Sequence, residues 1–427
     1  MTVLSAIIGA GFASGKEIIS FFGKNGYFAI PFFLLVAGLF FFCFYLFSKL
    51  GKMIKSKSIA DMTSAMFGKA GVFVDFMFIL CTFITLSSML AGSDAIGSII
   101  FGASYNFCYI SIITAMLTVL VVYFGLKYIY KITNAIVPLT IVIMLAVLVA
   151  FLAISPAQQV SQSNISFNGF SAVLSCFLYV SMNVFINIFI ISKSSQYMNK
   201  KQIGVASAIC ASVLLCLLVL VVVAVMHGGD AIFSSNMPML AIANSLGGWL
   251  GILYAVMLWL AIFTTLCLAG YTIMAWLNRY IKNKFVCSVI TLTLGFIFSR
   301  FGFSNIVDIF YPIEGIFGTL LIAYCAVYYF KNKKSYEAKQ QMAISAQSNL
   351  QTNSGAQEDK NILPSSTQNK QDDKKALNSP APRQSKLKSA KQNVTTDGLK
   401  SVKVEKKNGS ILVTKKFSDG KVTKSKK

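Results

Sequence analysis

Ionisable side chains are scarce in this chain. Only 12% of its 427 residues are charged, and it holds a single histidine, His227. A lone histidine excludes His-based zinc sites and leaves little for general acid–base chemistry. The chain also lacks a P-loop, a nucleophile elbow and paired catalytic carboxylates, which argues against an ATP-driven pump and an enzyme. We therefore expect no catalytic residues and no cofactor.

Two further absences concern processing and cross-linking. The nine cysteines all fall in or beside apolar segments, and residues 331–427 have none. This distribution does not fit a disulfide framework, so the cysteines are expected to pack as small apolar side chains. The N-terminus has no charged n-region or cleavage signature, so a removable signal peptide is not expected.

Apolar residues, in contrast, dominate the sequence. The chain is 56% hydrophobic with a mean hydropathy of +0.67, which indicates a polytopic membrane protein. About 20 apolar residues cross a bilayer. By that measure the sequence predicts an all-α protein with ten spans, at about 2–22, 28–48, 71–101, 108–126, 133–154, 169–191, 203–226, 248–278, 285–300 and 304–330.

Basic residues orient these spans. Lysines and arginines cluster in alternate loops, after residues 48, 126, 192, 278 and 330, whereas the loops at 102–107, 155–168 and 227–247 have none. Only Lys24 and Arg300 lie near the other face. The positive-inside rule then predicts a bacterial-type plasma-membrane protein with both termini in the cytoplasm.

The spans divide into five and five, and segments 71–101 and 248–278 occupy the same place in each half. Both are about 31 residues long. An odd number of spans per half gives the halves opposite orientations, which is the signature of an inverted repeat. Coincidence in the segment boundaries is the alternative.

Three glycines interrupt the first span, where residues 9–15 read Gly-Ala-Gly-Phe-Ala-Ser-Gly. Each glycine costs a helix interior roughly 1 kcal/mol relative to alanine. A broken helix at membrane depth is tolerated only where it is buried in protein or lines a polar cavity. Such breaks hold the substrate in many secondary transporters. The alternative is a small-residue packing face formed by Gly9 and Ala13.

The glycine-rich first helix, the 5+5 halves and the long third and eighth segments together resemble the amino acid–polyamine–organocation superfamily, which has the LeuT fold. Residues Gly9 to Ile18 are similar to the first-helix motif of the YkvI-like membrane proteins. The resemblance covers about residues 1–330. One departure is that only eight residues, none charged, precede Gly9. We expect either a short first half-helix or a start codon further upstream, and favour the second.

The resemblance places a substrate site at the break. The positive end of the following half-helix can receive a substrate carboxylate. The segment 169–191 should mirror the first and should be broken as well, although it contains no internal glycine or proline. Its Asn183 and Asn187 could instead join neighbouring helices. The candidate substrate residues are Gly9, Ala10, Gly11, Phe12, Ala13, Ser14, Gly15, Tyr179, Ser181 and Asn183.

A sodium site is implied in the same way. In sodium-coupled members of the fold, an Ala-x-x-[Ser/Thr]-[Ser/Thr] run supplies a carbonyl and two hydroxyls to Na⁺, and carbonyls of the first helix complete the shell. The matching residues here are Ala261, Thr264, Thr265, Ser5 and Ile8. Alternatively, both threonines bond back to their own helix. The proton-coupled version has a lysine in the fifth helix, which segment 133–154 lacks, and this favours Na⁺.

Charges inside the spans are functional candidates. We expect Lys16 to pair with Asp308 as a gate on the outer side of the substrate, with Glu17 beside it and Glu314 about two turns deeper than Asp308. Solvation of Lys16 by Glu17 at the interface is the alternative.

The C-terminal residues 331–427 carry 22 Lys and Arg against 8 Asp and Glu. They are rich in polar residues and poor in aromatic ones, so most of this tail should be disordered. Asn408-Gly409 and Asp419-Gly420 are hairpin-turn signals beside alternating runs such as Ser410–Phe417. The charge favours contact with anionic lipid, and no nucleic acid partner is expected.

These patterns predict a secondary active transporter of an amino acid or similar small organic solute, coupled to Na⁺ and, failing that, to H⁺. A nutrient or germinant-type receptor on the same fold, or a channel or scaffold, stays open. The sequence does not define the substrate.

Overall fold

The computed structural model describes residues 8–55, 59–101, 108–158, 160–196, 198–358, 399–407, 410–417 and 422–426. The chain forms two compact units, Met1–Ser354 and Gly355–Lys427. The predicted boundary at residue 330 falls inside helix α15, because the polar residues that follow the last apolar ones continue the same helix.

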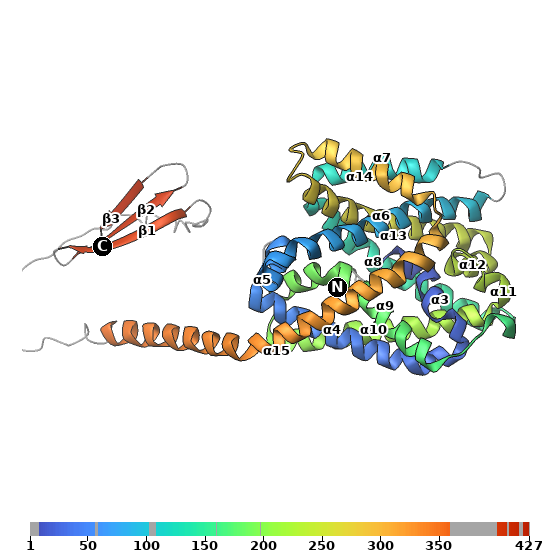
Figure 1. Ribbon diagram of the computed structural model, residues 1–427, viewed down its shortest axis with the longest axis horizontal. Coiled ribbons are helices and arrows are strands. Elements are labelled where there is room, and N and C mark those ends of the chain that lie inside the picture. Colours follow the sequence, from blue (N-terminus) through green and yellow to red (C-terminus); the bar gives the residue numbers. More distant parts are fainter. Residues whose placement is uncertain are drawn as a thin grey trace, which may run out of the picture. The chain divides into compact units, whose positions relative to one another are not determined.

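The first unit is helical, as Figure 1 shows. Its first half contains α2 (Ala10–Ser14), α3 (Lys16–Phe22), η1 (Gly23–Phe32), α4 (Phe33–Ile54), α5 (Ile59–Phe67), η2 (Gly68–Ala70), α6 (Gly71–Phe101), α7 (Tyr109–Phe124) and α8 (Leu126–Ile154). Its second half contains η4 (Gln162–Asn164), α9 (Gly169–Ser195), α10 (Lys200–His227), α11 (Gly229–Phe233), α12 (Pro238–Ser245), α13 (Gly248–Leu277), α14 (Lys284–Ser299) and α15 (Phe303–Glu358).

Seven helices in the described residues are long and apolar enough to cross a membrane, and α7 and α14 are shorter apolar helices. With the pair α2 and α3, these helices coincide with the ten predicted segments. The total number of spans stays a prediction. The two long segments are long in the structure too, since α6 has 31 residues and α13 has 30.

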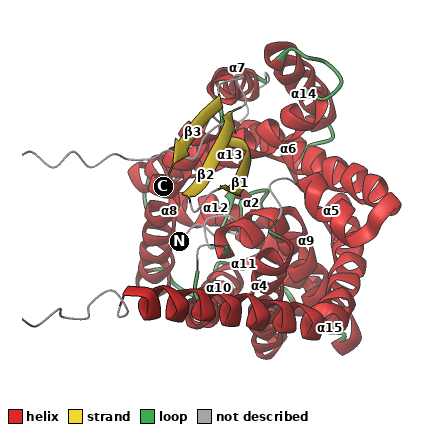
Figure 2. Ribbon diagram, turned by 90° about the vertical axis from the view of Figure 1, so that its left-hand side faces the viewer, coloured by secondary structure: helices red, strands yellow, loops and turns green. Residues whose placement is uncertain are grey.

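The core helices pack in two groups. In Figure 1, α6, α7, α13 and α14 lie together in the upper half and α4, α9 and α10 in the lower half. Figure 2 shows the same separation from another side, with α7 and α14 at the top and α4 and α10 near the bottom.

Helix α15 touches both groups. The hydroxyl of Tyr311 donates to Ser88 Oγ of α6 at 2.9 Å. Gly315 and Gly318 lie against the backbone of α9, where an added Cβ would come within 2.6 Å of the Leu178 carbonyl oxygen and 2.5 Å of that of Ser181. The two glycines therefore allow α15 and α9 to approach as closely as backbones can.

The second unit is a three-stranded antiparallel sheet in the order β1 (Leu399–Lys407), β2 (Ser410–Phe417), β3 (Val422–Lys426). Val413 of β2 pairs with Val404 of β1 and with Ser425 of β3. The run Ser410–Phe417 is thus a strand. The turn signals Asn408-Gly409 and Asp419-Gly420, and the expected disorder of 359–398, lie outside the described residues.

Candidate substrate and ion site

The first helix is broken at Gly15. This residue ends α2 and precedes α3 with a φ of 76° and a ψ of −10°, a left-handed conformation that glycine adopts without steric cost. The Gly15 amide donates to the Phe12 carbonyl at 3.0 Å, and the Gly15 carbonyl accepts from the Ile19 amide at 3.2 Å. The interruption predicted from the glycines is present.

The backbone groups that the break frees find partners in the protein. Tyr254 of α13 donates its hydroxyl to the Ala13 carbonyl at 2.6 Å. Ser14 Oγ donates to the Gly11 carbonyl at 2.7 Å and accepts from the Lys16 amide at 3.2 Å. Residues 10–15 are all buried, so the break satisfies the condition for irregular backbone at membrane depth.

The two pieces of the broken helix belong to different helix groups. The first piece, α2, packs against α13 and α12, whereas α3 packs against η1, α9 and α10. A shift of one helix group relative to the other would therefore change the backbone geometry at the break.

The predicted sodium ligands meet only in part. Gly9 lies against α13, where an added Cβ would be 3.4 Å from Thr265 Oγ1, so the first helix does face the threonine pair. Thr264 and Thr265 both donate to the Ala261 carbonyl, at 2.9 and 3.0 Å, as the alternative interpretation expected. Ile8 is buried nearby, and Ser5 lies outside the described residues.

The expected break in segment 169–191 is wrong, because α9 is continuous from Gly169 to Ser195. Asn183 Nδ2 donates to the Tyr179 carbonyl at 3.0 Å, and Asn187 Nδ2 to the Asn183 carbonyl at 2.8 Å. These polar side chains therefore bond within their own helix, and no glycine or proline interrupts it. Ser181 Oγ accepts from Thr319 of α15 at 2.9 Å.

Tyr179 connects α9 to the break. Its ring packs edge-on against Phe21 and Phe22 of α3, with centroids 5.5 and 5.3 Å away. Its hydroxyl is buried and has no hydrogen-bond partner among the described residues. The Tyr179 hydroxyl is thus an unsatisfied polar group beside α3.

The charged candidates separate into an outer pair and an inner pair. Lys16 Nζ lies 3.2 Å from Asp308 Oδ2, which links α3 to α15 as expected. Glu17 does not solvate Lys16 at an interface, because it is 7% exposed and folds back over Gly11, where an added Cβ would overlap its carboxyl. Glu314 is fully buried.

Sequence reasoning did not bring Glu17 and Glu314 together. Both are buried in the structure, on helices α3 and α15 that the Lys16–Asp308 pair joins. The sequence did single out both residues as unusual, because residues 1–330 hold only seven acidic side chains. The tertiary structure was needed to show that both carboxyls are buried on adjoining helices.

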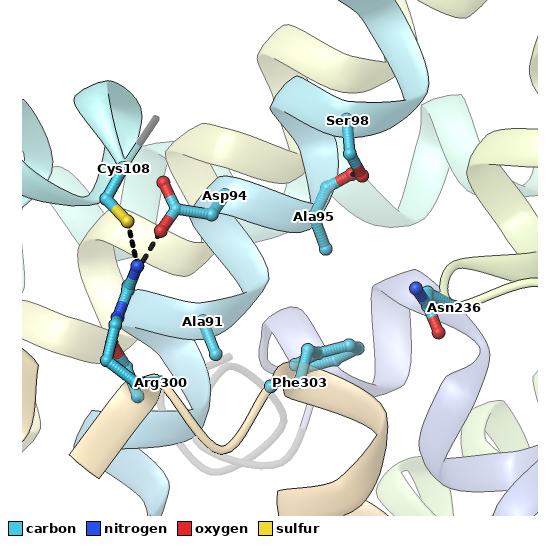
Figure 3. Close-up of a pocket in the computed structure, with 10 residues that line it drawn as sticks. Ala91, Asp94, Ala95, Ser98, Cys108, Asn236, Arg300 and Phe303 are labelled. Atoms are coloured by element: carbon cyan, nitrogen blue, oxygen red, sulfur yellow. Dashed lines mark hydrogen bonds and ion pairs between the residues drawn. The ribbon is translucent and has the colours of Figure 1, made fainter. Parts of the chain in front are cut away.

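A pocket of about 320 Å³ opens on the predicted outer side (Figure 3). Arg300 spans one edge of it, with its guanidinium 2.8 Å from Asp94 Oδ2, beside Cys108 Sγ and 4.5 Å from the Phe296 ring. Asn236 and Phe303 line other parts of its wall. The basic group near the outer face is thus neutralised by an ion pair.

Removing the Lys16–Asp308 pair tests the gate. We expect Lys16→Met or Asp308→Asn to lower solute uptake several-fold, and the exchange Lys16→Asp with Asp308→Lys to recover part of it. Because Asp308 is 45% exposed, the pair contributes at most about 1 kcal/mol, or roughly fivefold. Uptake into proteoliposomes measures this effect. An exchange variant no better than either single variant would contradict an ionic gate.

Comparison with known proteins addresses the fold and the relatives. The structure is similar to that of MhsT in complex with L-phenylalanine, with a TM-score of 0.56, 14% identity and coverage of 75% of this chain and 86% of MhsT. It is also similar to Mhp1 in an inward-facing conformation, with a TM-score of 0.55, 13% identity and coverage of 78% and 77%. Both are LeuT-fold transporters. The protein has the LeuT fold.

Two relatives come from Bacillus subtilis. The uncharacterised membrane protein YkvI is 22% identical over 315 residues, which cover 73% of this chain and 90% of YkvI. The uncharacterised protein YyaD is 24% identical over 347 residues, or 77% of this chain and 95% of YyaD. No protein-family model matches the chain. The resemblance to YkvI-like proteins is confirmed, and the chain is a multi-pass membrane protein.

Proposed function

We propose that this LeuT-fold protein is a secondary active transporter that imports an amino acid or similar small organic solute by alternating access. The observation that carries the proposal is the buried break at Gly15, whose two half-helices pack on different helix groups. A solute bound there would contact both groups at once. That MhsT binds L-phenylalanine on the same fold supports a small organic solute.

The break offers backbone groups to such a solute. In the present conformation the Lys16 amide donates a hydrogen bond to Ser14 Oγ, and the Tyr254 hydroxyl donates one to the Ala13 carbonyl. A bound carboxylate could replace the first contact, and a bound amine the second. Either exchange would couple solute binding to the position of α13 or α3, which transport requires.

Na⁺ is the proposed coupling ion, held by the carbonyls of Ile8 and Ala261 and the hydroxyls of Thr264 and Thr265. The proximity of Gly9 to Thr265 supports this site, because it brings the backbone that precedes α2, including Ile8, close to the Thr265 hydroxyl. Both hydroxyls currently donate to Ala261, so their oxygen lone pairs remain available to a cation. A hard monovalent ion would accept such neutral oxygen ligands.

The double change Thr264→Ala with Thr265→Ala is expected to abolish Na⁺ dependence. Uptake would be measured in proteoliposomes incubated in a mixture of radiolabelled amino acids, with and without an inward Na⁺ gradient. Thr272→Ala is the matched control, because Thr272 lies on the same helix and bonds back to Leu268 at 2.9 Å. Na⁺-stimulated uptake that survives the double change would contradict the site.

The same assay separates the alternatives. Solute binding without uptake would indicate a receptor, and no binding would exclude both a receptor and an amino acid transporter. Cytoplasmic termini, and attachment of the Lys-rich tail to anionic lipid, are further parts of the proposal that protease accessibility and vesicle binding would test.

A further inference from the structure

Glu314 is a buried carboxyl without a partner. Its side chain has no exposed surface, and neither of its oxygens has a hydrogen-bond partner among the described residues. It follows Phe303, the first residue of α15, by eleven positions, which places it about 16 Å along the helix. That depth is near the middle of a hydrocarbon core about 30 Å thick.

A second buried carboxyl lies on the neighbouring helix α3. Glu17 is 7% exposed and lies over Gly11, and the residue before it, Lys16, lies 3.2 Å from Asp308 of α15. Electrostatic coupling between Glu17 and Glu314 agrees with this placement. The other titratable groups coupled to the pair are Cys81 of α6, Tyr179 of α9 and Tyr311 of α15.

The basic side chains near this region form ion pairs with other residues. Lys16 is paired with Asp308 at 3.2 Å, and Arg300 with Asp94 at 2.8 Å. Among the described residues, no ion pair joins a lysine or arginine to Glu17 or Glu314. Two neighbouring carboxylates without a cation are very unfavourable in an apolar interior, so at least one must be neutral.

We propose that Glu17 and Glu314 hold one proton between them in the packed conformation and release it when α3 moves away from α15. The two carboxyls sit on different helices, since α3 packs with α9 and α10, whereas α15 lies against α9 at Gly315 and also bonds to α6 through Tyr311. Loss of the Lys16–Asp308 contact would let α3 and α15 part. Separation would admit water to the pair, which then ionises by loss of that proton. The transport cycle that would use this proton rests on the proposed function, whereas the proton site itself does not.

Infrared spectroscopy tests the proton site without any solute. Full-length protein in lipid vesicles at neutral pH should show the carbonyl stretch of a neutral carboxylic acid. The double change Glu17→Gln with Glu314→Gln should remove this band, and either single change should shift it. Asp230→Asn is the control, because Asp230 is an ionised outer carboxyl: hydrogen bonds from Ser161 hold its pKa below the ordinary value. If the band is absent from the wild type, or persists in the double variant, the proposal is overturned.

A second experiment tests whether the proton moves. In Na⁺-free proteoliposomes with an alkaline interior, wild-type uptake of the amino acid mixture should exceed uptake without the pH gradient several-fold. Glu314→Gln should lose this stimulation but keep exchange of labelled for unlabelled amino acids. Equal stimulation in the variant would overturn the transport part. Absence of wild-type uptake under every gradient would instead contradict the proposed function and leave the infrared result to decide the proton site.

Discussion

Gly51→Ala is expected to lower the melting temperature of the protein by several degrees. Gly51 lies where α4 meets α9, and an added Cβ would overlap the backbone carbonyl of Ser192. A backbone cannot rotate away as a side chain can, so the two helices must separate. They are also joined by hydrogen bonds from Ser192 Oγ to the Phe47 carbonyl and from Ser195 Oγ to the Ser48 carbonyl, at 3.2 and 2.9 Å.

The expected effect follows from overpacking, which lowers the free energy of unfolding by about 1–3 kcal/mol in a well-packed core. The loss is greater where the added atom overlaps backbone atoms. For a helical unit of this size that corresponds to a fall of roughly 1.5–4 °C, and more where the backbone overlaps. Gly38→Ala is the matched control, because it lies on the same helix with open space around it. Thermal unfolding of the purified protein measures both. Equal melting temperatures for the two variants would contradict the close packing of α4 and α9.

Gly11→Ala is expected to lower solute uptake at least about tenfold with little change in melting temperature, a cost of about 1.4 kcal/mol on the transport step. The added methyl would overlap the carboxyl of Glu17, whose Cγ is also only 2.9 Å away. Glu17 can rotate, so the fold survives. Its carboxyl must then leave the buried position that it holds over Gly11.

The double variant Gly11→Ala with Glu17→Ala separates two causes of that loss. It relieves the overlap but lacks the carboxyl, so uptake should stay low if the carboxyl is what transport needs. Recovery of uptake in the double variant would show that crowding alone caused the loss. Gly38→Ala serves again as the control, with wild-type uptake expected.

Local chemistry explains why some features were predictable. The break at Gly15 follows from three glycines in seven residues, and the lengths of α6 and α13 follow from continuous apolar sequence. The Lys16–Asp308 pair was predictable because few charges lie in the spans and opposite charges at similar depth attract. The break expected in α9 failed because it was taken from fold symmetry, whereas no glycine or proline lies between Phe170 and Ser195 to interrupt the helix.

The sequence by itself determined the membrane class, the interruption of the first helix and the set of rare charges, because hydropathy and glycine content act over neighbouring residues. Only the tertiary structure decided that Glu17 turns inward over Gly11 while Lys16 turns to Asp308. These residues are adjacent in sequence and differ in the helix face they occupy. It also decided that Glu17 and Glu314, nearly three hundred positions apart, are buried on adjoining helices, because α3 and α15 are brought together only by the packing of the whole helical unit.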